Sequence, residues 1–300
     1  MKTTPLVSIL VISYNSSKTI LETLESAKEQ TYPNIELIIS DDCSKDDTVE
    51  LCKKWLLTNS KRFVNTSLVI SNVNKGVSAN CNQAITHATG VWGKIIAGDD
   101  ILLPNCISSN LCFTDNNPEA CFIFSKMRTF VEKNGKKDLQ NVYPIVKWEE
   151  YFDYNAEEQH GLLCHFSFLP TPTFFFKIDE IRKNMYNESY RFCEDYPQWF
   201  NLTGRGYKLY LNPSELVLYR IEESLFQSSN RFVNPNFMLT YKLFFYNEVA
   251  PELYKKDMLT FIKQEKKIFL YDFSIIILKN KKNLFTKVLY RLFSKILFVI

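Results

Sequence analysis

The sequence has 300 residues, 46% of them hydrophobic, with only 8 Gly and 11 Pro, a composition that excludes a disordered or fibrous chain. The formal net charge is +3, and residues 261–300 hold nine Lys or Arg against two acids. Because the positive charge gathers in this tail, the body of the chain is not expected to bind nucleic acid, and the tail is expected to have a separate role.

The first hundred residues alternate between short apolar runs and amphipathic segments. The apolar runs are rich in β-branched residues and nearly continuous, which is typical of strands buried on both faces of a parallel sheet. The predicted strands are 6–13, 35–40, 68–71 and 93–97, and the predicted helices are 18–30, 47–57 and 77–87. Four strands that alternate with three helices predict a right-handed parallel α/β sheet.

Each of these predicted strands ends in polar residues. They are Tyr14, Asp41-Asp42, Asn74-Lys75-Gly76 and Asp99-Asp100. Ligands of parallel sheets bind outside the carboxyl ends of the strands, so these clusters are expected to converge on one edge. Two adjacent acids after a buried strand are costly to desolvate unless a cation binds them, and carboxylate oxygens are suitable ligands for Mg²⁺ or Mn²⁺. The alternative, a solvated Asp-Asp turn, is weakened by the convergence of the four clusters.

Four motifs follow one another between residues 6 and 104. They are Val-Ser-Ile-Leu-Val-Ile-Ser-Tyr-Asn, Glu-Leu-Ile-Ile-Ser-Asp-Asp-Cys-Ser-Lys-Asp-Asp-Thr, Asn-Lys-Gly-Val-Ser and Ala-Gly-Asp-Asp-Ile-Leu-Leu-Pro. Their order and spacing resemble a family 2 glycosyltransferase. The resemblance implies a GT-A fold, which is a Rossmann-like, mostly parallel sheet flanked by helices. It also implies a nucleotide-diphospho-sugar donor, a divalent metal (Mn²⁺ or Mg²⁺) held at a DxD-type motif, and inversion at the anomeric carbon.

The same resemblance assigns roles to individual residues of this chain. Tyr14 matches the residue beside the nucleotide base, Asp42 the acid that accepts from the base, and Lys75 a contact to base or phosphate. Asp99 matches a residue that binds both donor and metal, and Asp100 matches a second metal ligand.

The middle of the chain gives weaker patterns. Predicted elements are a helix at 107–116, strands at 120–124 and 126–131, a turn at Gly135 and an irregular stretch at 142–161. The irregular stretch lies where the family varies to recognise acceptors. Residues 166–176 resemble the Pro-Ser/Thr strand beside the acceptor site, and Phe174, Phe175 and Phe176 are expected to be core residues. Two short strands, 207–211 and 215–220, follow.

Glu194 and Asp195 precede an aromatic-rich helix and resemble the family's Glu-Asp motif, whose Asp is the general base. Transfer needs such a base, because the attacking hydroxyl must lose its proton to a carboxylate at roughly 2.6–3.2 Å. Alternatively, these acids stabilise the helix N-terminus, an effect of about 0.3–1 kcal/mol. The upstream motifs favour Asp195 as the base.

The chain departs from the family pattern at two positions. Many members have an acid where this chain has Ala97, so the predicted metal site has one carboxylate fewer. Relatives often end the last strand with Tyr-Arg-x-His, with the His near the metal or diphosphate, and here Glu222 takes the place of the His. Glu222 is expected to be either a metal ligand or a solvated acid.

The tail after residue 230 is predicted to be helical. From Leu284, apolar residues recur at helical spacing while Lys287, Arg291 and Lys295 lie on another face, which is typical of a helix in the membrane interface. The alternative is a C-terminal helix packed on the core. The eight cysteines form no CxxC pair, and no apolar signal core lies at the N-terminus. We therefore expect a cytoplasmic protein, peripheral at the cytoplasmic face of the inner membrane.

These observations predict a GT-A domain over residues 1–225, with a donor half (1–104) and an acceptor half (105–225), and a helical region over 226–300. The predicted function is inverting transfer of a sugar from a nucleotide-diphospho-sugar, with UDP-sugars favoured. The expected acceptor is a glycan or polyprenyl-diphosphate-linked hydroxyl in surface polysaccharide synthesis. The alternative is a non-catalytic nucleotide-sugar-binding protein. A nucleotidyltransferase is disfavoured, because no Gly-rich phosphate loop follows the first strand.

Overall fold

A computed structural model describes residues 4–133, 135–221 and 231–299 of the chain. The chain divides into two compact units, Met1–Ile221 and Glu222–Ile300, and each is described by itself. The predicted boundary at residue 225 falls in the segment 222–230, which lies outside the described residues, so it stays a prediction.

Four parallel strands form the first half of the sheet. They are β1 (Val7–Ser13), β2 (Ile35–Asp41), β3 (Thr66–Ile70) and β4 (Trp92–Ala97), joined by α1 (Ile20–Lys28), α2 (Thr48–Asn59) and α3 (Val77–His87). β1 pairs in parallel with β2 and β4, and β2 pairs in parallel with β3. Every residue of β2 is buried, as its continuous apolar run predicts. The predicted alternation of strands and helices is confirmed.

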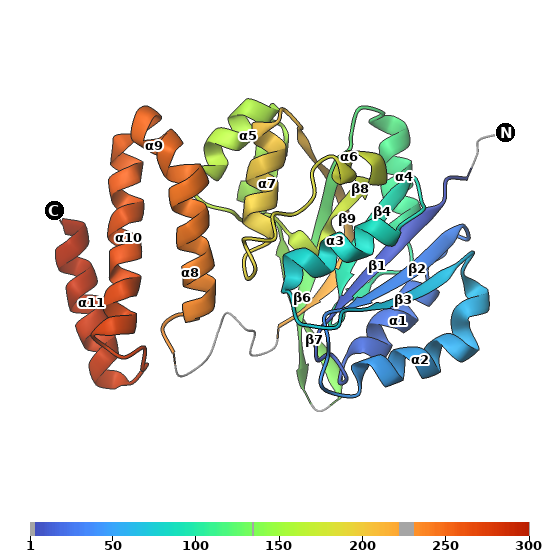
Figure 1. Cartoon of the computed structure of the whole chain (residues 1–300). Coiled ribbons are helices and arrows are strands. Elements are labelled where there is room, and N and C mark those ends of the chain that lie inside the picture. Colours follow the sequence, from blue (N-terminus) through green and yellow to red (C-terminus); the bar gives the residue numbers. More distant parts are fainter. Residues whose placement is uncertain (1–3, 134, 222–230, 300) are drawn as a thin grey trace. The chain divides into compact units, whose positions relative to one another are not determined.

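The order of these strands across the sheet is β3-β2-β1-β4 (Figure 1). The chain moves outward from β1 to β3 and then returns to the other side of β1. Right-handed crossovers therefore place α1 and α2 on one face and α3 on the opposite face. In such sheets the ligand crevice lies where the strand order reverses. Here that point lies between β1 and β4, whose carboxyl ends lead into Tyr14 and Asp99.

The second half of this unit adds antiparallel strands. Its elements are β5 (Ile101–Leu102), α4 (Cys106–Asn116), β6 (Phe122–Lys133), β7 (Lys136–Tyr143), α5 (Ala156–Leu163), β8 (Phe175–Lys177), α6 (Ile178–Arg182), α7 (Asp195–Gly204) and β9 (Leu209–Arg220). Short 3₁₀ segments lie at Ser60–Arg62, Val146–Phe152 and Thr171–Thr173. Across the described residues the sheet has nine strands, ordered β3-β2-β1-β4-β8-β6-β9-β5, with β7 beside β6 (Figure 1).

The sheet as a whole is mixed, so the prediction of a mostly parallel sheet is wrong. Four of the eight strand pairings within the described residues are antiparallel. One of these pairings follows from the short connection between β6 and β7, because strands joined by a tight turn run antiparallel. The parallel pattern holds for β1 to β4, where each connection contains a helix.

Two strands are longer than the sequence predicts. β6 is continuous where two strands were expected, and so is β9. Their parallel register slips between Ser125 and Lys126, opposite Pro213 and Ser214 of β9. Proline interrupts a strand ladder and is tolerated at such irregularities. The bulge therefore breaks the sequence pattern without breaking the strand.

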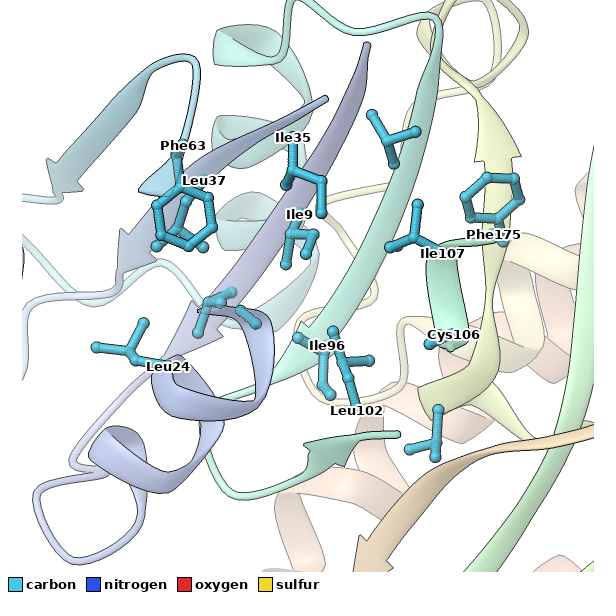
Figure 2. Packing of buried hydrophobic residues seen from close by; sticks show 14 of the residues in the cluster. Ile9, Leu24, Ile35, Leu37, Phe63, Ile96, Leu102, Cys106, Ile107 and Phe175 are labelled. Carbon is cyan, nitrogen blue, oxygen red and sulfur yellow. The ribbon is translucent and has the colours of Figure 1, made fainter. Parts of the chain in front are cut away.

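The core of this unit lies on the face of the four parallel strands that α1 and α4 cover. Figure 2 shows side chains from the strands, from α1 and from α4 meeting there, among them Ile9, Leu24, Ile96 and Ile107. Phe174, Phe175 and Phe176 are fully buried, which confirms their prediction as core residues. Burying one such side chain contributes about 1.5–3 kcal/mol. The packing fixes the course of β4, which carries Asp99 at its end.

The unit Glu222–Ile300 is helical over its described residues, as predicted. It contains α8 (Pro235–Phe244), a π-helical segment (Phe245–Val249), α9 (Ala250–Lys256), α10 (Met258–Ile276) and α11 (Leu284–Val299). α11 packs on α10 through stacked rings of Phe273 and Phe293, whose centroids lie 4.0 Å apart. Among the described helices, none has the length and apolar character needed to span a bilayer.

α11 leaves two stripes of side chains exposed. The apolar stripe consists of Phe285, Val288, Leu292 and Ile296, and the basic stripe consists of Lys287, Arg291 and Lys295. Phe285 is 70% exposed and Ile296 is 63% exposed. The predicted basic amphipathic helix is therefore present, with its apolar stripe uncovered in this structure.

Candidate active site

The loop after β2 shapes the donor side of the predicted site. The Asp42 carboxylate is 2% exposed, and its two oxygens accept from the backbone amides of Lys75 at 2.8 Å and Gly76 at 2.7 Å. Gly76 has a φ of +95°, which an L side chain rarely adopts. Asp42 therefore holds the Lys75-Gly76 turn in place, and its predicted contact with a nucleotide base stays a prediction.

Two exposed side chains lie at this edge. The Tyr14 ring is 45% exposed and directly follows β1. Lys75 is exposed, and its ammonium has no ion pair or hydrogen bond with any residue that the structure describes. An aromatic face and an unpaired cation at one edge match the chemistry of a nucleotide base and a phosphate.

The loop that carries Asp99 is tied to α1 on both sides. The Thr19 hydroxyl donates to the carbonyl of Gly98, and the Thr23 hydroxyl donates to the carbonyl of Asp100, each at 2.8 Å. Asp99 is exposed, whereas Asp100 is 1% exposed. The two adjacent acids therefore have different environments, with Asp99 facing outward and Asp100 facing inward.

Asp100 is a buried acid, and one of its carboxylate oxygens accepts no hydrogen bond from the described residues. Its Oδ1 accepts from the Arg220 amide at 3.0 Å, and its Oδ2 has no hydrogen-bond partner among the described residues. Burial, and then the charge of Asp99, raise the pKa of Asp100 well above its usual range. A divalent cation would offset both charges, and two carboxylates are suitable ligands for it. The residues present therefore fit the predicted metal.

Arg220, the last residue of β9, binds the loop that carries Asp99 and Asp100, here called the acid loop. Its Nε donates to the carbonyl of Asp99 at 2.9 Å and its Nη1 to Glu132 at 2.6 Å, while Nη2 pairs with Glu22. The guanidinium lies over the Phe130 ring, 4.7 Å from its centroid. One buried cation thus connects β9 and β6 to the backbone of the acid loop.

Asp195 begins α7 and is half-buried. Its Oδ1 accepts from the Tyr196 amide at 2.7 Å, and its Oδ2 accepts from the Thr171 hydroxyl at 3.0 Å. Burial raises the pKa of Asp195, and these two hydrogen bonds oppose the rise. Burial and the charge of Asp195 raise the pKa of Glu194 to about 8. A carboxylate with a raised pKa is suited to accept a proton near neutral pH.

The segment before Asp195 returns to the donor side. Arg191 Nη2 donates to the backbone and side-chain oxygens of Asn74, each at 2.6 Å. The Ser78 hydroxyl donates to the carbonyl of Tyr190 at 2.9 Å. These bonds connect the segment that carries the predicted base with the loop that carries Lys75.

The surroundings of Tyr219 indicate that two acid pairs, Asp99-Asp100 and Glu194-Asp195, lie near one another. Burial and, to a smaller extent, the charges of Asp100, Asp99, Asp195 and Glu194 together raise the pKa of the Tyr219 phenol to about 12. Such charge effects require proximity, so acids that are about a hundred residues apart in the chain flank one side chain of β9.

The structure thus brings the predicted metal ligands Asp99 and Asp100 and the predicted base Asp195 near Tyr219, and it joins Asp42 to the backbone of Lys75. Glu222 lies outside the described residues. Sequence reasoning missed Thr171, Tyr219 and Arg220 as site residues. A detectable signal existed for Arg220, because a charged residue directly follows the apolar run 216–219 at the end of the strand, and the structure buries it to 5% exposure. For Thr171 the only signal was its place in the Pro-Thr stretch.

A sequence model described as Glycosyl transferase family 2 matches residues 8–182. WfaP of Escherichia coli, named a UDP-Glc:alpha-D-GlcNAc-diphosphoundecaprenol beta-1,3-glucosyltransferase, is 30% identical over 205 residues, which cover 68% of this chain and 72% of WfaP. The putative glycosyltransferase EpsE of Bacillus subtilis is 31% identical over 132 residues, 44% of this chain and 46% of EpsE. The chain therefore matches less than half the length of EpsE.

Two solved structures have the same fold. S. aureus TarS 1-349 in complex with UDP-GlcNAc has a TM-score of 0.59 and 19% identity, covering 90% of this chain and 73% of that one. The mannosyltransferase PcManGT from Pyrobaculum calidifontis, in complex with GDP-Man and Mn²⁺, has a TM-score of 0.56 and 16% identity, covering 85% and 64%. These likenesses confirm the GT-A fold. Together with the family match, they lead to one conclusion: the chain belongs to glycosyl transferase family 2.

Proposed function

We propose that this glycosyltransferase moves a sugar from a UDP-sugar to an acceptor hydroxyl with inversion at the anomeric carbon. The observation that carries the proposal is the position of two acid pairs, Asp99-Asp100 and Glu194-Asp195, around Tyr219. One pair suits the charge of a diphosphate with its metal, and the other suits a proton acceptor. Both are needed at one reacting centre.

The donor occupies the edge formed by Tyr14, Asp42 and Lys75. The exposed Tyr14 ring stacks against the base, Asp42 fixes the turn that presents Lys75, and the Lys75 ammonium contacts base or phosphate. Support for a uridine nucleotide comes from the TarS complex, which contains UDP-GlcNAc, and from the name of WfaP, which specifies UDP-Glc.

Asp99, with Asp100 beside it, would hold a divalent ion, Mn²⁺ or Mg²⁺, together with the diphosphate. The support is that Asp99 is exposed and that Oδ2 of Asp100 has no hydrogen-bond partner within the described part of the chain. When bound, such an ion stabilises the negative charge of the departing diphosphate. Arg220 keeps the two acids in position through the backbone of this loop.

Asp195 accepts the proton of the acceptor hydroxyl. The acceptor oxygen forms a bond to the anomeric carbon while the bond from that carbon to the diphosphate oxygen breaks, and the electron pair leaves with the nucleoside diphosphate. The proton passes to Asp195, whose carboxylate is fixed by Thr171 and Tyr196. A single displacement without an enzyme nucleophile inverts the configuration.

The acceptor is a polyprenyl-diphosphate-linked glycan of surface polysaccharide synthesis, reached at the cytoplasmic face of the inner membrane. The name of WfaP specifies a diphosphoundecaprenol-linked acceptor, and AmsB of Erwinia amylovora is named for amylovoran biosynthesis. α11 supports membrane contact, because its apolar stripe is exposed beside its basic stripe. Anionic lipid contributes about 1 kcal/mol for each nearby Lys or Arg.

The experiment is calorimetric titration of the full chain with UDP-, GDP- and TDP-sugars, with and without Mn²⁺, followed by measurement of nucleoside diphosphate release. Mn²⁺-dependent binding of a UDP-sugar with slow donor hydrolysis is expected. Binding without turnover, even with lipid-linked glycan acceptors present, would instead identify a non-catalytic nucleotide-sugar-binding protein. Tight binding of a GDP- or TDP-sugar alone would contradict the donor assignment.

A further inference from the structure

Lys94 is a charged residue in the middle of β4, and the proposed reaction does not use it. Its side chain is fully buried, although β4 otherwise consists of apolar residues and glycine. Burial lowers the pKa of this ammonium to about 8. Fully buried lysines are rare unless their donors are satisfied, so the contacts of Lys94 require an explanation.

The Lys94 ammonium ties β4 to the turn that precedes β8. Its Nζ donates to the carbonyl of Ile95 at 2.7 Å and to the carbonyl of Pro172 at 2.6 Å. Pro172 lies in the 3₁₀ segment Thr171–Thr173. The bond therefore links two segments that are 78 residues apart in the chain.

The same turn is held on its other side. The Thr173 hydroxyl donates to the carbonyl of Pro170 at 2.7 Å, and the Ser125 amide donates to Thr173 Oγ1 at 3.0 Å. The remaining hydroxyl of the turn belongs to Thr171, which donates to Asp195 Oδ2 at 3.0 Å and has the Leu169 carbonyl as a longer alternative acceptor at 3.4 Å. Lys94 and Thr173 thus fix the backbone of a turn whose Thr171 side chain reaches the proposed base, Asp195.

We propose that Lys94 and Thr171 are positioning residues for Asp195. Lys94 holds the Pro172 carbonyl, and this fixes the direction in which Thr171 presents its hydroxyl to the carboxylate. The proposal rests on the proposed function of Asp195 as the base. It implies that β4, which carries the metal-site acids at its end, also positions the base from its middle, so both halves of the reacting centre share one strand.

A pH effect follows from the geometry. A hydroxyl that donates to a carboxylate stabilises its ionised form, so losing this bond raises the pKa of Asp195. The titratable groups around Asp195 are Glu194 and Cys193, which precede its helix, Tyr186 and, from β9, Tyr219. Around Lys94 they are Cys106 and Asp100. Because Glu194 and Asp195 interact, the acidic limb of the rate profile reports the pair.

The test measures UDP release from UDP-glucose and UDP-GlcNAc with Mn²⁺ and water as acceptor, as kcat/KM between pH 5 and 9. The variants are Thr171→Val, Thr171→Ser, Lys94→Met and the double variant Lys94→Met/Thr171→Val. The matched control is Lys177→Met, which makes the same change on the adjacent strand β8, where Lys177 lies over Trp92. Hydrogen exchange of residues 171–174 provides a readout that does not depend on activity.

We expect the acidic limb to move upward by about one pH unit in Thr171→Val, because a hydrogen bond to a charged group has that strength. Thr171→Ser retains the wild-type limb. Lys94→Met moves the limb in the same direction and increases exchange of residues 171–174. The double variant shifts the limb no further than Thr171→Val alone, because Lys94 acts on Asp195 only through the hydrogen bond from Thr171, which Thr171→Val already removes. Lys177→Met leaves the limb and the exchange unchanged.

An unmoved limb in Thr171→Val, or additive shifts in the double variant, would overturn the proposal. If Lys94→Met does not fold, as judged by circular dichroism, Lys94→Gln replaces it, because its amide still donates one bond and a smaller shift is expected. Asp195→Asn is measured in parallel. If it retains UDP release, the base assignment itself fails, and this outcome is distinct from failure of the positioning proposal.

Discussion

The Arg220 amide donates to Asp100 Oδ1 at 3.0 Å, and the guanidinium of the same residue donates to the carbonyl of Asp99 at 2.9 Å. One residue at the end of β9 therefore binds both members of the acid pair. The pair is held through its backbone and through the buried carboxylate of Asp100, while Asp99 is exposed.

Replacing Arg220 tests this arrangement. Arg220→Met removes a cation whose side chain is 2% exposed, and it takes an ion pair from Glu132 and from Glu22, which keeps its second ion pair with Lys137. Breaking a buried pair costs roughly 3–5 kcal/mol, and about 2–3 kcal/mol is expected here because both acids are partly exposed. Urea unfolding measures the loss. Arg128→Met, at an ion pair with Glu215 whose side chains are 33% and 29% exposed, is the control and should cost at most about 1 kcal/mol. Equal losses in the two variants would contradict the special role of Arg220.

The metal assignment predicts a selective loss in Asp99→Asn. The variant should fold normally, because Asp99 is exposed, and should lose Mn²⁺-dependent binding of a UDP-sugar by at least about tenfold, as seen by calorimetry. Chelation with EDTA should weaken donor binding by wild-type protein to the same level. Asp153→Asn, an exposed acid before α5, is the matched control. Unchanged binding in Asp99→Asn would remove this residue from the metal site.

Glu194 predicts a dependence of stability on pH. Its pKa of about 8 in the folded chain lies above that of an unfolded glutamate, so the folded state binds the extra proton. Stability should therefore fall as the pH rises from about 4.5 toward 8. Glu194→Gln should flatten this part of the profile in urea unfolding at pH 5 to 8, whereas Glu150→Gln, an exposed acid, should not. A wild-type profile that rises over this range would contradict the buried, protonated state.

Much of the donor half was predictable, and the reason is local. β1 to β4 are buried on both faces, so their sequences are continuous apolar runs, and their polar ends are visible as clusters. β7 was missed because it is an exposed edge strand with the sequence Lys-Lys-Asp-Leu-Gln-Asn-Val-Tyr, which carries no alternating pattern. The bulge beside Pro213 similarly divided β6 and β9 in the sequence pattern.

The contacts that position the acids were not predictable from the sequence. Arg220 acts on Asp100 across 120 residues, and Lys94 acts on Pro172 across 78. No periodicity reports which carbonyl a buried cation will meet, because that depends on how distant strands pair. The only sequence signal at Lys94 was a charged residue within an apolar strand. The only sequence signal at Thr171 was its place in a Pro-Thr stretch.

The tail predicts salt-dependent binding to anionic membranes. Replacing the basic stripe (Lys287, Arg291 and Lys295) with Gln should weaken binding to phosphatidylglycerol-containing vesicles by about 3 kcal/mol, or roughly 100-fold, at low salt. Vesicle co-sedimentation measures the change. The control carries Gln at Lys53, Lys54 and Lys61, on and just after α2, and should bind as wild type. Equal binding by both triple variants would contradict membrane contact through α11.

The central claim is that Asp195 takes the proton of the attacking hydroxyl. The most direct measurement is kcat for UDP release by Asp195→Asn, with Asp153→Asn as control and Mn²⁺-dependent donor binding measured on the same samples. The account predicts a loss of about 10²–10⁴-fold in kcat with donor binding retained. Wild-type turnover in Asp195→Asn would contradict it.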